Sequence, residues 1–351
     1  MEKVIKQCVG IDCAKDELVV SYGVMDGNYD TRILSNTKFK NASMGFKKLL
    51  QWSNKLNPNK SEVVYLLEST GVYHEKFAMY LHENSCKVVI ILPNKAKAFS
   101  KTLTIKTVND KVSAQMLAQL GLEKKLDPWQ PPGAIYNILR QLTRERDQLK
   151  IEQTQIKNQL HAEKSGAWPN EGSIKRMKTR LRLIAKQVEE AEAEINQHIK
   201  KEPWLKEKIR KVCTIKGVGF ITAVTVIAET NGFNLIRNKK QLVSYAGLDV
   251  ITKDSGTSVR SKPRISHRGN KYLRKCLHFP ALSAIRSSKP MKGLFTRLVS
   301  KHGIKMKAAV AVQRKQLILI YTLWKKDEIF DANYHLKKEE PQQVGALQEL
   351  A

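Results

Sequence analysis

The sequence predicts a chain with an α/β domain at its N-terminus, a long helical arm, and a mainly α-helical domain at its C-terminus. Short β-rich runs alternate with helical runs from residue 3 to residue 100. The segment DPWQPPG at 127–133 cannot continue a helix and marks a boundary. Beyond it, apolar residues recur at seven-residue intervals, which is typical of a long helix. A chain of 351 residues is long enough for two domains, each with its own core.

The first domain, residues 1–126, begins with three expected strands, VIKQCVGID, ELVVSYGVMDG and TRILSNTKF, the second of which ends in an Asp-Gly turn. A helix is expected near 43–56, followed by the strands EVVYLLES and CKVVIILP with a helix near 74–84 between them. Strands joined by short turns, then strands that alternate with helices, favour a mixed sheet flanked by helices over a purely parallel sheet. This is the strand order of a ribonuclease-H-like fold.

The helical arm is expected over residues 134–202. Its first half has apolar residues seven apart, at Ile135, Leu142, Leu149 and Ile156. After the break SGAWPNEGS, the apolar steps alternate between three and four, at Ile174, Met177, Leu181, Ile184, Val188, Ala191 and Ile195. Two such helices fold back as an antiparallel pair or coil with another subunit. We favour a coiled-coil arm that mediates oligomerisation over a purely internal hairpin.

Residues 203–326 predict a mainly helical domain, and the polar residues 327–351 predict a flexible tail. Five cysteines show no Cys-x-x-Cys spacing, so neither a zinc site nor a disulfide framework is indicated. The N-terminus shows no apolar signal region, and no apolar run approaches the roughly 18 residues of a membrane span. We therefore expect a cytoplasmic protein without a membrane partner.

The charge of the chain is strongly unbalanced, with 62 Lys and Arg against 33 Asp and Glu and a formal net charge of +29. Self-repulsion of this size destabilises the folded state unless an anion neutralises it, and a nucleic-acid backbone does so while releasing counterions. DNA, RNA or both are therefore the expected partners. The alternatives are an unusually soluble cytosolic protein or one that sits on anionic membrane, but no basic amphipathic helix or lipidation motif supports the latter.

Three carboxylates each terminate an otherwise apolar element: Asp12 in VGIDCAK, Glu68 in YLLES, and Asp110 in NDKVSAQMLAQLG. Carboxylates that converge at the ends of neighbouring elements repel one another unless divalent cations lie between them, and hard oxygen ligands suit Mg²⁺ or Mn²⁺. Such a site positions and polarises a phosphodiester. Taken singly, the three residues could equally be a turn residue, a satisfied polar group and a helix N-cap.

A glycine pair in VCTIKGVGFITAVTVIAET, Gly217 and Gly219, separates two helical stretches and predicts a helix-hairpin-helix. Glycines there let backbone N–H groups at a helix N-terminus approach a phosphate, which gives DNA contact without sequence preference. The alternative is a plain turn between two helices.

A basic segment, ITKDSGTSVRSKPRISHRGNKYLRK, holds seven Lys and Arg and no acidic residue between Ser258 and Lys275. Its glycines and proline predict a loop that leads into a helix at Asn270, and its interleaved Ser, His and Arg suit phosphate contacts. The alternative is a solvated run of charge. The candidate nucleic-acid-binding side chains are Arg260, Lys262, Arg264, His267, Arg268, Lys271 and Arg274.

These motifs resemble a known family. GIDCAKDE, LLESTGVYHE and NDKVSAQMLAQLGL resemble the RuvC-like domain of insertion-sequence-110 transposases, and LVSYAGLDVITKDSG followed by GNKYLR resembles their C-terminal transposase domain. The resemblance implies that Asp12, Glu68 and Asp110 are metal ligands and that Ser255 is a nucleophile. The family usually carries a fourth carboxylate three residues after the helix aspartate, where this chain has Ser113. The hydroxyl of Ser113 could reach a cation directly or through water, although a neutral ligand binds Mg²⁺ more weakly.

The resemblance implies a DNA transposase or site-specific recombinase of an insertion sequence. Ser255 would attack a DNA phosphorus and leave a covalent phosphoserine, a metal at the carboxylates would stabilise the transition state, and Arg260, Arg264, His267 and Arg274 would hold phosphates. In the family, the two domains of one active site come from different subunits of a homo-oligomer, and a structured RNA pairs with target and donor DNA. The alternatives are a metal-dependent nuclease of the Holliday-junction type, with Ser255 as a loop residue, and a non-catalytic nucleic-acid-binding relative.

Overall fold

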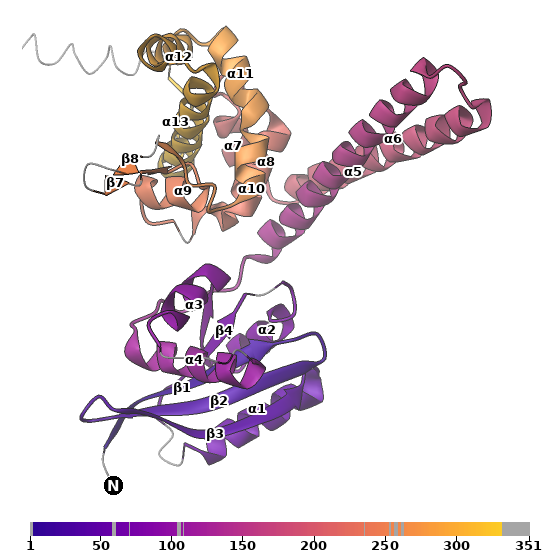
Figure 1. Ribbon diagram of the computed structural model, residues 1–351. Helices are drawn as coiled ribbons and strands as arrows, with labels where there is room; N and C mark the ends of the chain where they lie inside the picture. Colours follow the sequence, from indigo (N-terminus) through magenta and orange to yellow (C-terminus); the bar gives the residue numbers. More distant parts are fainter. Residues whose placement is uncertain are drawn as a thin grey trace, which may run out of the picture. The chain divides into compact units, whose positions relative to one another are not determined.

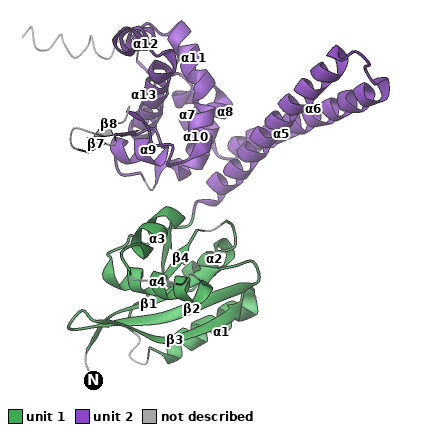
Figure 2. Cartoon of the chain, in the orientation of Figure 1, with its two compact units in different colours: residues 1–131 green, residues 132–351 purple. Residues whose placement is uncertain are grey.

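The computed structural model describes residues 3–57, 61–69, 71–103, 107, 109–234, 236–252 and 263–331, together with the backbone of residues 254–255 and 259–260. The chain forms two compact units, residues 1–131 and 132–351 (Figures 1 and 2). The division falls within the Pro-Pro-Gly segment that the sequence marks as a boundary.

The first unit contains a five-stranded mixed sheet with strand order β3-β2-β1-β4-β5. The strands are β1 (Val4–Cys13), β2 (Glu17–Asp26), β3 (Thr31–Lys40), β4 (Val63–Glu68) and β5 (Lys87–Ile91). Strands β1, β2 and β3 pair antiparallel, whereas β4 pairs parallel with both β1 and β5. The predicted mixed α/β domain is therefore confirmed, and each expected strand is present.

Helices cover both faces of this sheet. They are α1 (Ser43–Lys55), α2 (Glu75–Glu83), α3 (Pro93–Ser100) and α4 (Asp110–Glu123). Alternate residues of β1 point to opposite faces. Val9 and Ile11 pack in one core with residues of α1 and α2, while Cys8 packs in another with residues of α3 and α4.

Helix α4 lies unusually close to β1 because glycines remove the side chains between them. A Cβ on Gly10 would run into the backbone of Ala114 and Ala118, and one on Gly121 would run into the side chain of Cys8. At the C-terminal end of α4, Lys6 Nζ donates to the carbonyl of Leu122 at 2.6 Å. The helix is therefore fixed along β1, and its N-terminal end is directed to the end of that strand.

The second unit begins with an antiparallel pair of long helices, α5 (Ala134–Ser165) and α6 (Glu171–Lys200) (Figure 1). Ile184 and Val188 of α6 pack against Ile156 of α5 within the same chain. The apolar stripe thus has a partner surface within the chain, and the role of the arm in oligomerisation stays a prediction. The base of the arm is also no separate domain, because Leu139 and Ile195 belong to the core of the C-terminal helices.

The rest of the second unit is mainly helical, as predicted. Its helices are α7 (Pro203–Val212), α8 (Phe220–Glu229), the 3₁₀ turn η1 (Asn231–Phe233), α9 (Lys239–Tyr245), α10 (Lys271–Cys276), α11 (His278–Ser287), α12 (Lys289–His302) and α13 (Lys305–Lys326). The core of this unit includes Leu317, Ile320 and Trp324 of α13. No described helix is long and apolar enough to cross a membrane. Of the predicted tail, residues 332–351 lie outside the described residues.

Where the sequence predicts a loop between α9 and α10, the structure has two short strand pairs. Strand β6 (Val250–Ile251) pairs antiparallel with β9 (Arg264–Ile265), and β7 (Asp254–Ser255) pairs antiparallel with β8 (Val259–Arg260). We call β6, β7, β8 and β9 together the serine hairpin, and the pair of β6 with β9 its stem. Each of its strands is only two residues long, which is too short to show an alternating pattern in the sequence.

Candidate functional site: a carboxylate edge and a serine hairpin

The three predicted carboxylates lie at one edge of the sheet in the first unit. Asp12 is close to the end of β1 and Glu68 is the last residue of β4. These strands run parallel, and their register pairs Ile11 with Leu67, so Asp12 and Glu68 follow side by side. Asp110 is the first residue of α4, which begins at the N-cap Asn109. Because Gly10 lets α4 approach β1, the start of that helix is brought to Asp12.

The charges of these carboxylates act on one another. Burial, and then the negative charges of Asp110 and Glu68, together raise the pKa of Asp12 to about 6. The backbone N–H of Cys13 acts in the opposite direction. The pKa of the Cys13 thiol is raised by burial first and then by Asp12 and Glu68. The edge of the sheet is thus a focus of negative charge.

The chemistry of this donor set suits a hard divalent cation, but its spacing does not yet form a closed site. Across the part of the chain that the structure describes, no three His, Cys, Asp or Glu side chains are grouped closely enough to hold a metal ion. Ser113 lies half-buried on α4, one turn after Asp110. The carboxylates are therefore close enough to raise the pKa of Asp12, and a cation would have to draw them together.

Ser255 lies in β7, where its backbone pairs with Val259 of β8. The side chains of Ser255 and Arg260, and all of Lys262, lie outside the described residues. In the second unit, the structure therefore gives the backbone pairing of the strand that carries the predicted nucleophile and of the stem next to it.

Four of the side chains predicted to contact phosphate are exposed, and a fifth is half-buried. Arg264, His267, Arg268 and Lys271 are exposed around the stem of the serine hairpin. Arg274 is half-buried, and its Nη1 donates to the carbonyl of Ala246 at 2.9 Å. Its role in the described structure is to tie α10 to the end of α9.

The glycine pair between α7 and α8 has two separate roles. Gly217 has a φ of +89°, and a Cβ there would collide with the carbonyl of Pro280 and with Ala284 of α11. Close packing accounts for this glycine, as in the plain-turn alternative. Gly219 is the N-cap of α8, and a Cβ there would meet nothing within 4 Å. The space around Gly219 is therefore unobstructed. Its contact with a phosphate stays a prediction.

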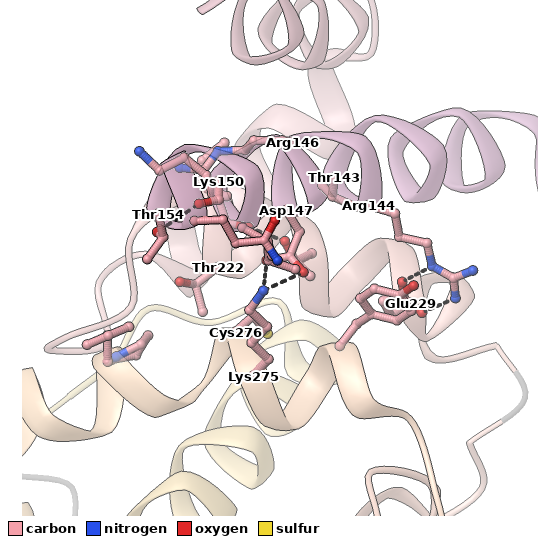
Figure 3. Close-up of a pocket in the computed structure, with 17 residues that line it drawn as sticks. Thr143, Arg144, Arg146, Asp147, Lys150, Thr154, Thr222, Glu229, Lys275 and Cys276 are labelled. Carbon is pink, nitrogen blue, oxygen red and sulfur yellow. Dashed lines mark hydrogen bonds and ion pairs between the residues drawn. The ribbon is translucent and has the colours of Figure 1, made fainter. Parts of the chain in front are cut away.

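One functional candidate was missed by the sequence analysis. A groove of about 580 Å³ is lined by residues of α5, α8, α10 and α11, and Glu229 lies in it with an ion pair to Arg144 (Figure 3). Its side chain is 1% exposed. Glu229 ends the apolar run TAVTVIAE, the same signal that identified Asp12 and Glu68, and that criterion would have found it.

Two family models match the chain. A model described as a transposase matches residues 9–166, which include all three carboxylates of the sheet edge. A model described as a transposase of the IS116/IS110/IS902 family matches residues 209–296, which include the serine hairpin.

Curated relatives agree with these matches. The pilin gene-inverting protein of Moraxella bovis is 27% identical over 94% of this chain and 99% of its own length. The transposase for insertion sequence element IS1111A of Coxiella burnetii is 28% identical over 45% of each chain. Among solved structures, Thermus thermophilus RuvC superposes with a TM-score of 0.27 at 13% identity, over 35% of this chain and 99% of that one. That score is too low for the superposition to bear on function. The two family matches and these relatives together place this chain in the IS110 family of transposases, as a DNA transposase or recombinase.

Proposed function

We propose that the chain cuts and rejoins DNA for an insertion sequence through a covalent bond to Ser255, assisted by a cation at Asp12, Glu68 and Asp110. The observation that carries the proposal is the focus of negative charge at the sheet edge, where Asp110 and Glu68 raise the pKa of Asp12. Carboxylates gathered in this way are costly to the fold and are typical of a site that serves catalysis.

In the proposed reaction, the Oγ of Ser255 forms a bond to a DNA phosphorus as its proton is lost. The bond from that phosphorus to one sugar oxygen breaks, and the released oxygen takes up a proton. A sugar hydroxyl of the other strand then reverses these steps and frees the serine. A bound Mg²⁺ or Mn²⁺ would neutralise charge on the phosphate, with Ser113 as a weaker, neutral partner to the three carboxylates.

Charge and family together support the proposed partners. The net charge of +29 suits a protein that holds a structured guide RNA as well as target and donor DNA. The exposed cations Arg264, Arg268 and Lys271 are suited to phosphate contacts. Relatives named pilin gene-inverting proteins support the cutting and rejoining of DNA. A homo-oligomer would allow the carboxylates of one subunit to serve the serine of another.

Ser255→Ala tests the proposal, because the change deletes one oxygen and no charge. We expect recombination and the covalent protein–DNA adduct to be lost while nucleic-acid affinity is unchanged. Ser287→Ala, at an exposed serine that ends α11, is the matched control. Metal-dependent cleavage without an adduct in the wild type would favour the junction-nuclease alternative. Binding without any metal-dependent turnover would favour the non-catalytic relative.

A further inference from the structure

Glu229, the C-terminal residue of α8, has a buried carboxylate that bonds to two parts of the chain that are distant in sequence. Its side chain is 1% exposed. Its carboxylate accepts from Arg144 Nε at 2.6 Å and from Arg144 Nη2 at 2.9 Å. It also accepts from Asn270 Nδ2 at 2.6 Å. Three donated hydrogen bonds thus compensate this carboxylate for its removal from water, and the loss of one donor would leave it under-bonded.

The two segments that flank the serine hairpin, residues 245–249 and 266–270, which we call its root, both bond to Glu229. Asn270 follows the hairpin, and its backbone N–H donates to the carbonyl of Tyr245 at 2.7 Å. Tyr245 ends α9, just before the hairpin, and its hydroxyl donates to the backbone carbonyl of Glu229 at 2.9 Å. Asn270 Oδ1 also accepts the N–H groups of Tyr272 and Leu273 and so caps α10.

The two segments of the root are also bonded to each other. The N–H of Ser266 donates to the carbonyl of Asp249 at 2.8 Å, and the Ser266 hydroxyl donates to its carboxylate at 2.5 Å. The N–H of His267 donates to the carbonyl of Gly247 at 3.3 Å. Strand pairs of two residues hold little register of their own, so the position of the hairpin depends on these root contacts.

The other end of the network lies in the arm. Arg144 belongs to α5, and its guanidinium lies 4.4 Å from the centre of the Tyr272 ring in α10. A second ion pair in the same groove, Lys275 to Asp147 at 2.7 Å, also joins α10 to α5 but has no bond to the hairpin root (Figure 3). The pair of Arg144 with Glu229 instead joins α5 to α8, and of the two pairs it is the one whose carboxylate also bonds to Asn270.

We propose that Glu229, Arg144 and Asn270 form a clamp that positions the serine hairpin relative to the base of the arm, and that they act as positioning residues for strand transfer. The inference rests on the proposed role of Ser255. The clamp sets the position and direction of β7, which carries Ser255. The three clamp residues themselves do not react with DNA. Its loss is expected to slow the chemical step without weakening DNA binding.

Asn270→Ser is the sharpest test, because serine still caps α10 but is too short to reach Glu229. The rate of adduct formation is measured at saturating DNA, at a temperature where every variant is folded. We expect a fall of about ten- to a hundredfold with DNA affinity unchanged, as for a reacting group displaced by about 1 Å. Asp147→Asn, which breaks the second ion pair, is the control and should leave the rate unchanged. A wild-type rate in Asn270→Ser, or an equal loss in Asp147→Asn, would overturn the clamp.

A charge-preserving exchange provides the rescue. Glu229→Gln alone sets an amide N–H₂ against that of Asn270, and Asn270→Asp alone sets two carboxylates together. In the double variant, the Gln amide donates to the Asp carboxylate, and the net charge is that of the wild type. The same Gln N–H₂ faces Arg144 Nη2, which donates to this oxygen of Glu229 in the wild type, so the bond to Arg144 is weakened. We expect the rate to be lost in each single variant and restored in part in the double. No restoration would count against positioning through this bond.

Hydrogen exchange separates the clamp from the serine chemistry. The amides of Ser266 and Asn270 should exchange faster in Asn270→Ser than in Asp147→Asn, in protein without DNA. Unchanged exchange overturns the clamp even if Ser255 is the nucleophile. An absent adduct in the wild type overturns the role of Ser255, and the exchange rates then decide whether the clamp holds the hairpin.

Discussion

Replacement of Asp12 by Asn should stabilise the metal-free protein while it abolishes strand transfer. Burial and the charges of Asp110 and Glu68 raise the pKa of Asp12 from 3.8 to about 6. Such a carboxyl binds its proton more tightly in the folded state, so it costs the fold stability as pH rises from about 4 to about 6. The amide carries no charge and removes that cost.

The size of the effect follows from the same shift. A pKa of about 6 in place of 3.8 corresponds to at most about 3 kcal/mol above both values. Because Asp12 is only half-buried, solvent screening reduces this to about 1 to 2 kcal/mol. For a unit the size of residues 1–131, that raises Tm by about 3 to 7 °C.

Differential scanning calorimetry at pH 7.5 with a chelator would measure this change in the N-terminal unit. The gain should vanish at about pH 2.5, where the carboxyl is protonated in both states. Added Mg²⁺ should stabilise the wild type more than Asp12→Asn, because the cation binds the folded carboxylates. Asp16→Asn, at an exposed position nearby, is the control. An unchanged or lower Tm for Asp12→Asn in chelator would refute the repulsion that we derive for this edge.

Three further changes test the geometry. Gly10→Ala places a methyl group in the backbone of α4, so it should cost about 1 to 3 kcal/mol and slow strand transfer in the folded protein; a wild-type Tm would contradict the packing. Ser113→Asp adds a charged ligand one turn from Asp110, worth about 1.5 to 3 kcal/mol, and should lower the Mg²⁺ midpoint of activity; a midpoint that stays or rises would count against this placement of α4. Ile184→Lys with Val188→Lys removes packing inside the arm and should reduce helicity by circular dichroism. A smaller assembly with unchanged helicity would instead show that the stripe packs between subunits.

The sequence predicted those elements of the fold that show a hydrophobic period of their own or that are bounded by turn and capping residues. Every strand of the first unit was expected because each is long enough to show β-rich character. A helix that starts at Asn270 was expected from local residue types, and α10 begins there, with the Asn270 side chain accepting its first N–H groups. The serine hairpin strands were missed because two residues have no period. The internal packing of the arm could not be chosen over association between subunits, since the same stripe suits both.

The site shows the same division. Carboxylates at the ends of apolar strands are visible in sequence, and Asp12 and Glu68 follow each other in neighbouring strands as a consequence of parallel pairing. The clamp was invisible because its members are separated by long stretches of chain, 85 residues between Arg144 and Glu229. The contact of Arg274 with Ala246 was hidden for the same reason.

The way the arm is rooted determines where the protein can be divided. Leu139 and Ile195 are fully buried among the C-terminal helices, so a fragment that ends near residue 203 would expose them to water. We expect such a fragment to aggregate, and a fragment that starts at residue 203 to lose one wall of its core. Division between residues 131 and 132 instead leaves each core intact. The carboxylate half and the serine half can therefore be produced separately and mixed, which would show whether one can complement the other in trans.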